Sequence, residues 1–179
     1  MIRLTGARQL TFLFPAERPV AFAFYRTTLR RLAAFLPHID LLNSYADDHA
    51  LLTYKARELA TYEIRMVFEV GLECDESSWL IRVAPRGNKQ KVKAQAGLNH
   101  TVGWGYYQSE SRFEPAGDQT RIHYTVALKG ELPTPTSMRL MPGIAIDRIA
   151  QSITGQRIDE IAQGFVQNSI TAYVAGQPI

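Results

Sequence analysis

The sequence predicts an α+β fold in which an antiparallel sheet packs against one long C-terminal helix. Between Ile39 and about Glu131, apolar residues recur at every second position, as in strands with one buried face. After Met141 they recur at a spacing of about 3.6 residues, as in an amphipathic helix. The 179 residues, 46% hydrophobic and 21% charged, suit one globular domain over residues 1–179.

The N-terminal segment predicts a strand followed by two short helices. Gln9–Phe14 is rich in apolar and aromatic residues, which favours a strand. Pro19 suits the first turn of a helix over Val20–Tyr25, because its missing N–H needs no partner there. A second helix is predicted over Thr28–Phe35, where leucines recur at helical spacing, and Pro37 ends it.

The middle of the chain predicts about six antiparallel strands. The clearest is Tyr62–Leu72, whose apolar residues alternate with charged ones and so indicate one buried and one wet face. Further strands are expected at Leu51–Arg57, Trp79–Ala84, Trp104–Glu114 and Thr120–Lys129. Gaps of hairpin length between these strands exclude a βαβ fold.

A proline-containing loop and a long helix complete the predicted order. Leu132–Met141 carries two prolines and is expected to be a loop, and Pro142 is well placed to open a helix. The stripe at helical spacing consists of Ile146, Ile149, Ile153, Ile161, Phe165 and Tyr173. Because an apolar stripe must be covered, this helix is expected to lie across the buried face of the sheet.

This order of elements resembles the helix-grip fold of the START, polyketide-cyclase and birch-allergen superfamily over nearly the whole chain. Closer similarities are the segment RLAAFLPHI at Arg31–Ile39, the turn at Leu132–Pro133 and the segment LMPG at Leu140–Gly143. These segments resemble a branch found in cyanobacteria and plant plastids. The resemblance implies a curved sheet of about seven strands and a cavity between sheet and helix, in which many members bind lipids, sterols or aromatic metabolites.

The net charge and the cysteine content restrict the binding partners and the cellular compartment that we expect. The net charge of +3 is too small for a duplex-binding domain, so no nucleic-acid partner is expected. One basic run (Arg86, Lys89, Lys91 and Lys93) is either a solvated loop or a contact with an anionic membrane surface. Cys74 is the single cysteine, which excludes an intrachain disulfide and fits a cytoplasmic protein. Neither a signal peptide nor a membrane span is expected.

The sequence carries no recognisable catalytic or metal-binding motif. Its four histidines lack HExxH or Cys/His spacing, so no metal or other cofactor is expected. Gly103-Trp104-Gly105 lies within a strand pattern and predicts a bulge or sharp curvature. The clear acids Glu63 and Glu69 fall on the wet face, so no catalytic residue is assigned.

The candidate ligand-binding residues are those that the patterns turn toward the space between sheet and helix. Four aromatic residues with a polar tip would contact either a ligand or a core partner: Tyr62, Trp104, Tyr106 and Tyr124. Five apolar residues would either line a cavity or fill the core: Met66, Phe68, Ile81, Ile149 and Ile153. Arg148 would pair with a ligand carboxylate or phosphate if it turned inward, and Arg139 would lie at a cavity mouth; both would otherwise be solvated.

These observations lead to one main hypothesis and two alternatives. The main hypothesis is that the protein binds or transports a hydrophobic or amphipathic small molecule (a lipid, pigment or aromatic metabolite) without catalysis. The first alternative is a cyclase- or dehydratase-type enzyme, which needs an inward acid or base with a shifted pKa. The second is a membrane-associated accessory protein. The main hypothesis requires that side chains do not completely fill the space beneath the helix.

Overall fold

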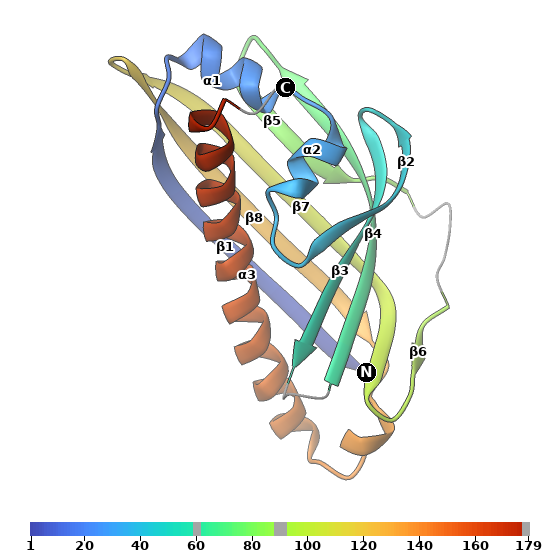
Figure 1. The fold of residues 1–179 in the computed structure, drawn as a ribbon. Helices are drawn as coiled ribbons and strands as arrows, with labels where there is room; N and C mark the ends of the chain where they lie inside the picture. Colours follow the sequence, from blue (N-terminus) through green and yellow to red (C-terminus); the bar gives the residue numbers. More distant parts are fainter. Residues whose placement is uncertain (59–61, 88–92, 177–179) are drawn as a thin grey trace.

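One curved sheet wraps around a long helix in the computed structural model, which describes residues 1–58, 62–87 and 93–176. The long helix, α3 (Gly143–Val174), crosses one face of the sheet (Figure 1). Two short helices, α1 (Arg18–Tyr25) and α2 (Leu29–Ala34), lie near the C-terminal end of α3. The α+β fold and its element order are therefore as the sequence predicts.

The sheet contains eight strands in the order β1-β8-β7-β5-β4-β3-β2, with β6 paired to β7. Their bounds are β1 Ile2–Phe14, β2 Ile39–Ala46, β3 His49–Glu58, β4 Tyr62–Asp75, β5 Leu80–Pro85, β6 Gln95–Ala96, β7 His100–Ala116 and β8 Gln119–Leu132. The strand β1 is longer than its predicted segment, because Ile2 and Leu4 continue the buried row across polar neighbours. A short 3₁₀ turn, Thr136–Met138, lies inside the predicted loop.

The pairing is antiparallel everywhere except between β4 and β7. The short strand β5 separates these two strands over only part of their length. Beyond the end of β5, residues 63–67 of β4 pair directly with residues 100–104 of β7, in parallel. The sequence pattern did not predict this contact, because it depends on how far β5 extends between its neighbours.

Two glycines on the inner face allow the sheet to pack closely on itself. Gly105 of β7 and Gly130 of β8 are paired in register. A Cβ atom at Gly105 would lie 2.6 Å from the ring of Phe68, and one at Gly130 would lie 2.6 Å from the sulfur of Met66. Phe68 and Met66 thus occupy the space that side chains at Gly105 and Gly130 would need. The β7–β8 register is continuous from Gly105 to Ala116, and Trp104 lies just outside it, so the bulge or sharp curvature predicted around Trp104 stays a prediction.

The helix α3 packs chiefly along β1. Its buried row includes small and polar residues, namely Ile146, Ala150, Thr154, Ile158, Ile161, Ala162, Phe165, Ser169 and Ala172. At Gly6 a Cβ atom would lie only 3.0 Å from Thr154. This close approach explains why the buried row differs from the predicted stripe: small residues face β1, while Ile149 and Ile153 lie half-buried beside them.

Candidate functional site

Among the described residues, two small cavities lie in the space between the sheet and the helices. The first, called here the α2 cavity, has a volume of about 20 Å³ and lies between α2 and the inner face of the sheet. The second, called the α3 cavity, has a volume of about 30 Å³ and lies beneath the N-terminal half of α3. Since a cavity of about 10–15 Å³ holds one water molecule, each cavity has room for only one or two. The interior is therefore nearly filled.

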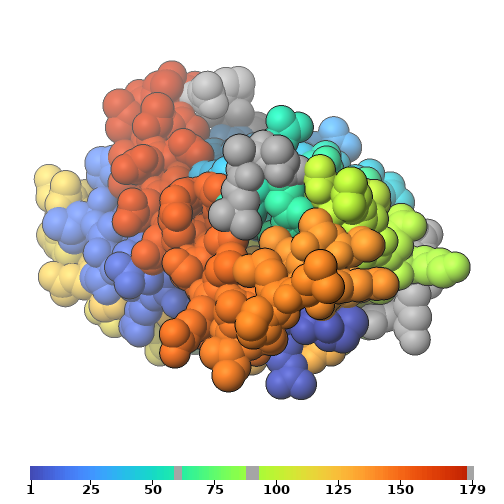
Figure 2. Space-filling view, turned by 90° about the horizontal axis from the view of Figure 1, so that it is seen from below, coloured from blue at the N-terminus to red at the C-terminus, as the bar shows by residue number. Residues whose placement is uncertain are grey.

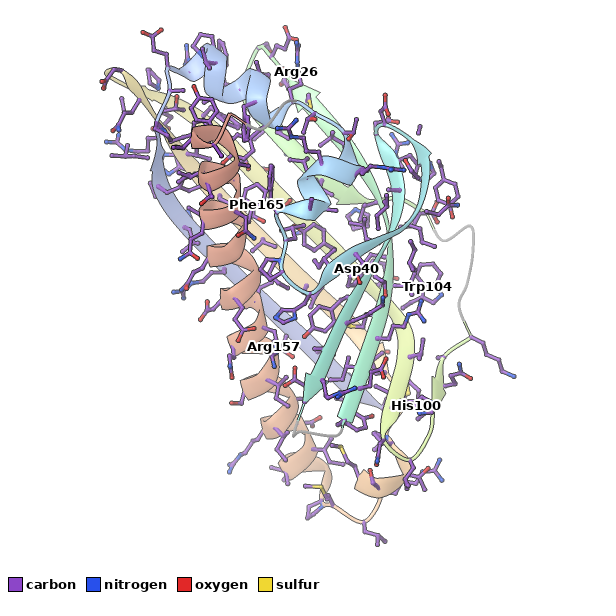
Figure 3. All side chains as sticks on the ribbon, in the orientation of Figure 1. Arg26, Asp40, His100, Trp104, Arg157 and Phe165 are labelled. Atoms are coloured by element: carbon purple, nitrogen blue, oxygen red, sulfur yellow. The ribbon has the colours of Figure 1, made fainter. Side chains whose placement is uncertain are left out.

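Aromatic packing accounts for the small size of the α2 cavity. Phe24 and Tyr25 of α1 contact Phe14 of β1, with ring centroids 5.4 and 5.3 Å away. Phe165 of α3 points inward and stacks on Tyr124 of β8 at 4.5 Å (Figure 3). Rings from four elements thus meet at this end of the molecule, since Tyr25 also contacts Phe165 at 5.7 Å. The sequence pattern did not predict this meeting, because it involves residues distant along the chain.

Hydroxyl groups form the polar part of the interior around the α2 cavity. The Tyr25 hydroxyl lies 2.7 Å from the Ser169 hydroxyl, and the hydroxyls of Tyr107 and Tyr124 lie 3.4 Å apart. Ser109 belongs to the same cavity wall. Burial raises the pKa of all three tyrosines above the usual value of 10. They are therefore neutral hydroxyls that can donate hydrogen bonds but do not act as bases near neutral pH.

The α3 cavity is almost entirely apolar and contains one orphaned polar group. Its wall includes Ile2, Leu4, Ile64, Leu132, Ile149 and Ile153. Tyr62 also lines it, and its buried hydroxyl has no hydrogen-bond partner within the described part of the chain. Burial raises the pKa of Tyr62 to about 12, and the nearby Thr101 hydroxyl lowers it in part. Thr101 is not in hydrogen-bond geometry with Tyr62, because its own hydroxyl donates to the Pro133 carbonyl oxygen at 2.9 Å. A buried hydroxyl usually has a partner, so that of Tyr62 is suited to meeting a ligand.

Several predicted ligand-binding residues do face the interior. Tyr62, Ile149 and Ile153 line the α3 cavity. Ile81 lines the α2 cavity, and Tyr124 reaches its wall through the hydroxyl contact with Tyr107.

Met66 and Phe68 are fully buried, but they pack against the glycines of β7 and β8. Along β4 these two residues follow Ile64, which lines the α3 cavity. Phe68 pairs with Leu52 of β3, which lines the α2 cavity. They therefore separate the two cavities.

The prediction that Trp104 and Tyr106 point inward is wrong. Tyr106 is 55% exposed, whereas its neighbour Tyr107 is 1% exposed and faces the interior. Trp104 lies on the outer face, away from α3 (Figure 3), with its indole N–H buried and without a partner among the described residues. The inner positions of β7 are taken by Gly103, Gly105 and Tyr107. A Cβ atom at Gly105 would meet Phe68 of β4, and one at Gly103 would meet Leu132 of β8, so only glycine leaves room for these two side chains.

For Arg148, which the sequence left either turned inward or solvated, the structure shows the solvated alternative. Arg148 and Arg139 are exposed. In the basic run, the Arg86 guanidinium lies 3.2 Å from the Asp48 carboxylate, and Lys93 is exposed. Lys89 and Lys91 lie outside the described residues, so the predicted anionic-surface contact through this run stays a prediction.

Two acidic residues, Glu58 and Glu69, are buried, although the predicted alternation places charged residues on the exposed face of each strand. Glu58 is buried at the end of β3, where both of its carboxylate oxygens contact the Arg157 guanidinium of α3 (Figure 3). Glu69 lies on the outer face as predicted, but it is buried rather than wet, and its carboxylate lies 2.8 Å from the His49 ring. Neither carboxylate lines one of the two cavities.

The described residues contain no group of three or more metal-ligating side chains. Within the same part of the chain, no helix combines the length and apolar character needed to cross a bilayer.

Comparison with known proteins extends the description of the fold. No protein-family model and no curated protein matches the sequence. Among solved structures, the Zhui aromatase/cyclase from Streptomyces sp. R1128 aligns over 98% of this chain and 99% of its own, with a TM-score of 0.54 and 7% identity. A protein of Thermus thermophilus aligns over 93% and 98%, with a TM-score of 0.53 and 14% identity. A Deinococcus radiodurans protein aligns over 92% and 98%, with a TM-score of 0.51 and 12% identity. At these identities the similarity establishes architecture and not activity: the chain has the helix-grip fold.

Proposed function

We propose that the protein binds a hydrophobic or amphipathic small molecule in the α3 cavity, with the Tyr62 hydroxyl bonding to the polar group of the ligand. The observation that carries this proposal is the buried Tyr62 hydroxyl, which has no hydrogen-bond partner among the described residues and lies in a wall that is apolar except for Thr101. A lipid chain, a pigment or an aromatic metabolite has the required chemistry, because each combines a large apolar surface with few polar atoms.

Binding requires the cavity to expand, since a typical ligand pocket has a volume of about 300–1,000 Å³. The N-terminal half of α3 is the element that moves in this proposal. Its residues Ile149 and Ile153 cover the cavity but are only half-buried. Gly155 follows them on the exposed side of the helix, and glycine is a weak helix former, so we take this position as the point at which the helix bends. An apolar ligand that buries about 200 Å² gains about 5 kcal/mol, which offsets the lost contacts of the helix.

The cavity walls favour binding over acid–base chemistry. The ionisable side chains that line the two cavities are Tyr25, Tyr62 and Tyr107. Their raised pKa values keep them neutral, so they orient a ligand by hydrogen bonding. The proposal therefore assigns positioning and not proton transfer to these residues.

Native mass spectrometry of the protein purified from its own host tests the proposal directly, because a retained small molecule appears as added mass. Titration with a pyrene-labelled fatty acid then locates the site. Ile153→Trp fills the α3 cavity and is expected to weaken binding of this probe at least about tenfold. Leu13→Trp changes an exposed residue of β1 and serves as the control. Equal probe affinity in wild type and Ile153→Trp would place the ligand elsewhere.

A further inference from the structure

We infer that the end of the molecule around the start of α3 is a docking surface for an anionic phospholipid bilayer. Five large apolar side chains are exposed there: Met1, Leu98, Leu140, Met141 and Ile144. They are called here the apolar tip. Figure 2 shows this end of the molecule, with the segment that opens α3 in orange and the N-terminal residues in blue beside it.

Hydrogen bonds between three chain segments hold the apolar tip together. The N-terminal ammonium group of Met1 donates to the Thr134 hydroxyl at 3.0 Å. The Ser137 hydroxyl donates to the carbonyl oxygen of Leu98 at 2.8 Å, and the Thr136 amide donates to that of Gly97 at 3.2 Å. The apolar side chains are thus presented by a connected surface rather than by an isolated loop.

The shape of the apolar tip suits a bilayer better than a protein partner. Leu140 is 98% exposed and Ile144 is 72% exposed, so both side chains protrude with few neighbours. A protein partner would need a shaped pocket for each of them, whereas the acyl region of a bilayer accepts any apolar protrusion. Isolated exposed apolar residues are ordinary, but a cluster at one end of a molecule marks an interaction site.

The charges beside the apolar tip complement an anionic membrane surface. Arg139 and Arg148 are exposed and make no ion pair with another described residue, and the one acid between them in the chain is Asp147. Basic residues beside inserted apolar side chains contact lipid phosphates and strengthen binding to anionic membranes. This surface is distinct from the Arg86–Lys93 run, where Arg86 already pairs with Asp48.

The apolar tip also adjoins the α3 cavity. Met138 and Ile146 line the cavity wall and flank Leu140, Met141 and Ile144 in the chain. Docking would therefore bring the proposed moving part of α3 to the bilayer surface. The inference itself does not require a ligand in the cavity, and its test uses the protein without added ligand.

Vesicle flotation tests the inference with the full chain. The probes are vesicles of phosphatidylcholine alone and of an equimolar mixture of phosphatidylcholine and phosphatidylglycerol. The wild type is expected to float with the mixed vesicles. Leu140→Glu/Ile144→Glu is expected to lower the bound fraction at least about tenfold, because charged groups oppose insertion. Val174→Glu is the matched control, since Val174 is 70% exposed at the opposite end of α3.

Replacing Arg139 and Arg148 provides a second test, which measures their electrostatic contribution to vesicle binding. Arg139→Gln/Arg148→Gln is expected to weaken binding to the mixed vesicles about five- to tenfold and to reduce its sensitivity to salt. Failure of the wild type to float with mixed vesicles, or undiminished flotation of both double variants, would overturn the inference. A wild-type dimer that the Leu140→Glu/Ile144→Glu change dissociates, without vesicle binding, would assign the apolar tip to self-association instead.

Discussion

Arg157 of α3 and Glu58 of β3 join the long helix to the side of the sheet opposite β1. The guanidinium donates to both carboxylate oxygens, at 2.7 and 3.1 Å. Glu58 is buried, so its charge depends on this partner. Because α3 packs chiefly on β1, this ion pair closes the interior on the β3 side.

Replacing Arg157 with methionine is expected to lower the free energy of unfolding by about 2–4 kcal/mol, because the Glu58 carboxylate is left buried without its partner. Urea denaturation measures the change. Glu58→Leu/Arg157→Met is expected to recover most of the loss, since no buried charge remains. Arg148→Met is the control: it changes an exposed residue of the same helix and is expected to cost less than about 0.5 kcal/mol. Equal losses at Arg157 and Arg148 would contradict the proposed role of the ion pair.

Glu160 makes stability depend on pH in the acidic range. Its carboxylate accepts hydrogen bonds from Arg157, His38 and Gln156, at 2.5, 2.9 and 3.1 Å. Partial burial raises the pKa of this carboxyl, but the hydrogen bonds outweigh burial and leave its pKa below the usual value. The folded state therefore holds this proton more weakly than the unfolded state. The resulting stabilisation is present above the unfolded-state pKa, about 4.3, and is lost as pH falls through the lower folded value.

Glu160→Gln is accordingly expected to flatten the pH dependence of unfolding free energy below about pH 4.5. Urea denaturation at a series of acidic pH values measures this slope. Asp147→Asn is the control, because Asp147 is exposed and makes no ion pair with another described residue. An unchanged slope in Glu160→Gln would show that other groups govern the acid transition.

Tyr62→Phe separates the ligand-binding role of the hydroxyl from its effect on stability. Removing a buried hydroxyl without a partner is expected to leave the free energy of unfolding unchanged or raise it by up to about 1 kcal/mol. The same change is expected to weaken binding of the pyrene-labelled fatty acid about tenfold if the hydroxyl bonds to its carboxyl group. Tyr25→Phe is the comparison, because it breaks the contact with Ser169 and is expected to cost about 1 kcal/mol. A destabilised Tyr62→Phe variant would reveal a structural partner for the hydroxyl.

Two glycine substitutions are expected to act in opposite directions. In Gly105→Ala, the new methyl group would lie 2.6 Å from the Phe68 ring and 2.8 Å from the Lys129 carbonyl oxygen, so a loss of about 2–4 kcal/mol is expected. In Gly155→Ala, the methyl group meets nothing within 4 Å, and a gain of about 1 kcal/mol is expected from helix propensity.

Thermal denaturation followed by circular dichroism measures both glycine changes. If the N-terminal half of α3 bends at Gly155, stopped-flow mixing will also show slower uptake of the pyrene-labelled fatty acid in Gly155→Ala. An uptake rate equal to that of wild type would remove Gly155 from the proposed opening motion.

The candidate site was only partly predictable from the sequence. Tyr62 follows from strand alternation in β4, where the pattern is strong, and Ile149 and Ile153 follow from the helical stripe. The errors at Trp104 and Tyr106 have one cause: alternation shows that neighbours point to opposite faces but does not show which face is inside. Larger aromatic residues favoured the wrong face. The glycines at the inner positions of β7 are explained only by the side chains that pack over them, Phe68 at Gly105 and Leu132 at Gly103.

The sequence by itself determined the kinds and order of the elements, because periodicities of 2 and 3.6 residues and the positions of proline are local properties of the chain. Only the tertiary structure decided the parallel pairing of β4 with β7, the meeting of Glu58 with Arg157 and the small size of the two cavities. These features depend on contacts between residues far apart in the chain, whose distances are set by the packing of all elements together.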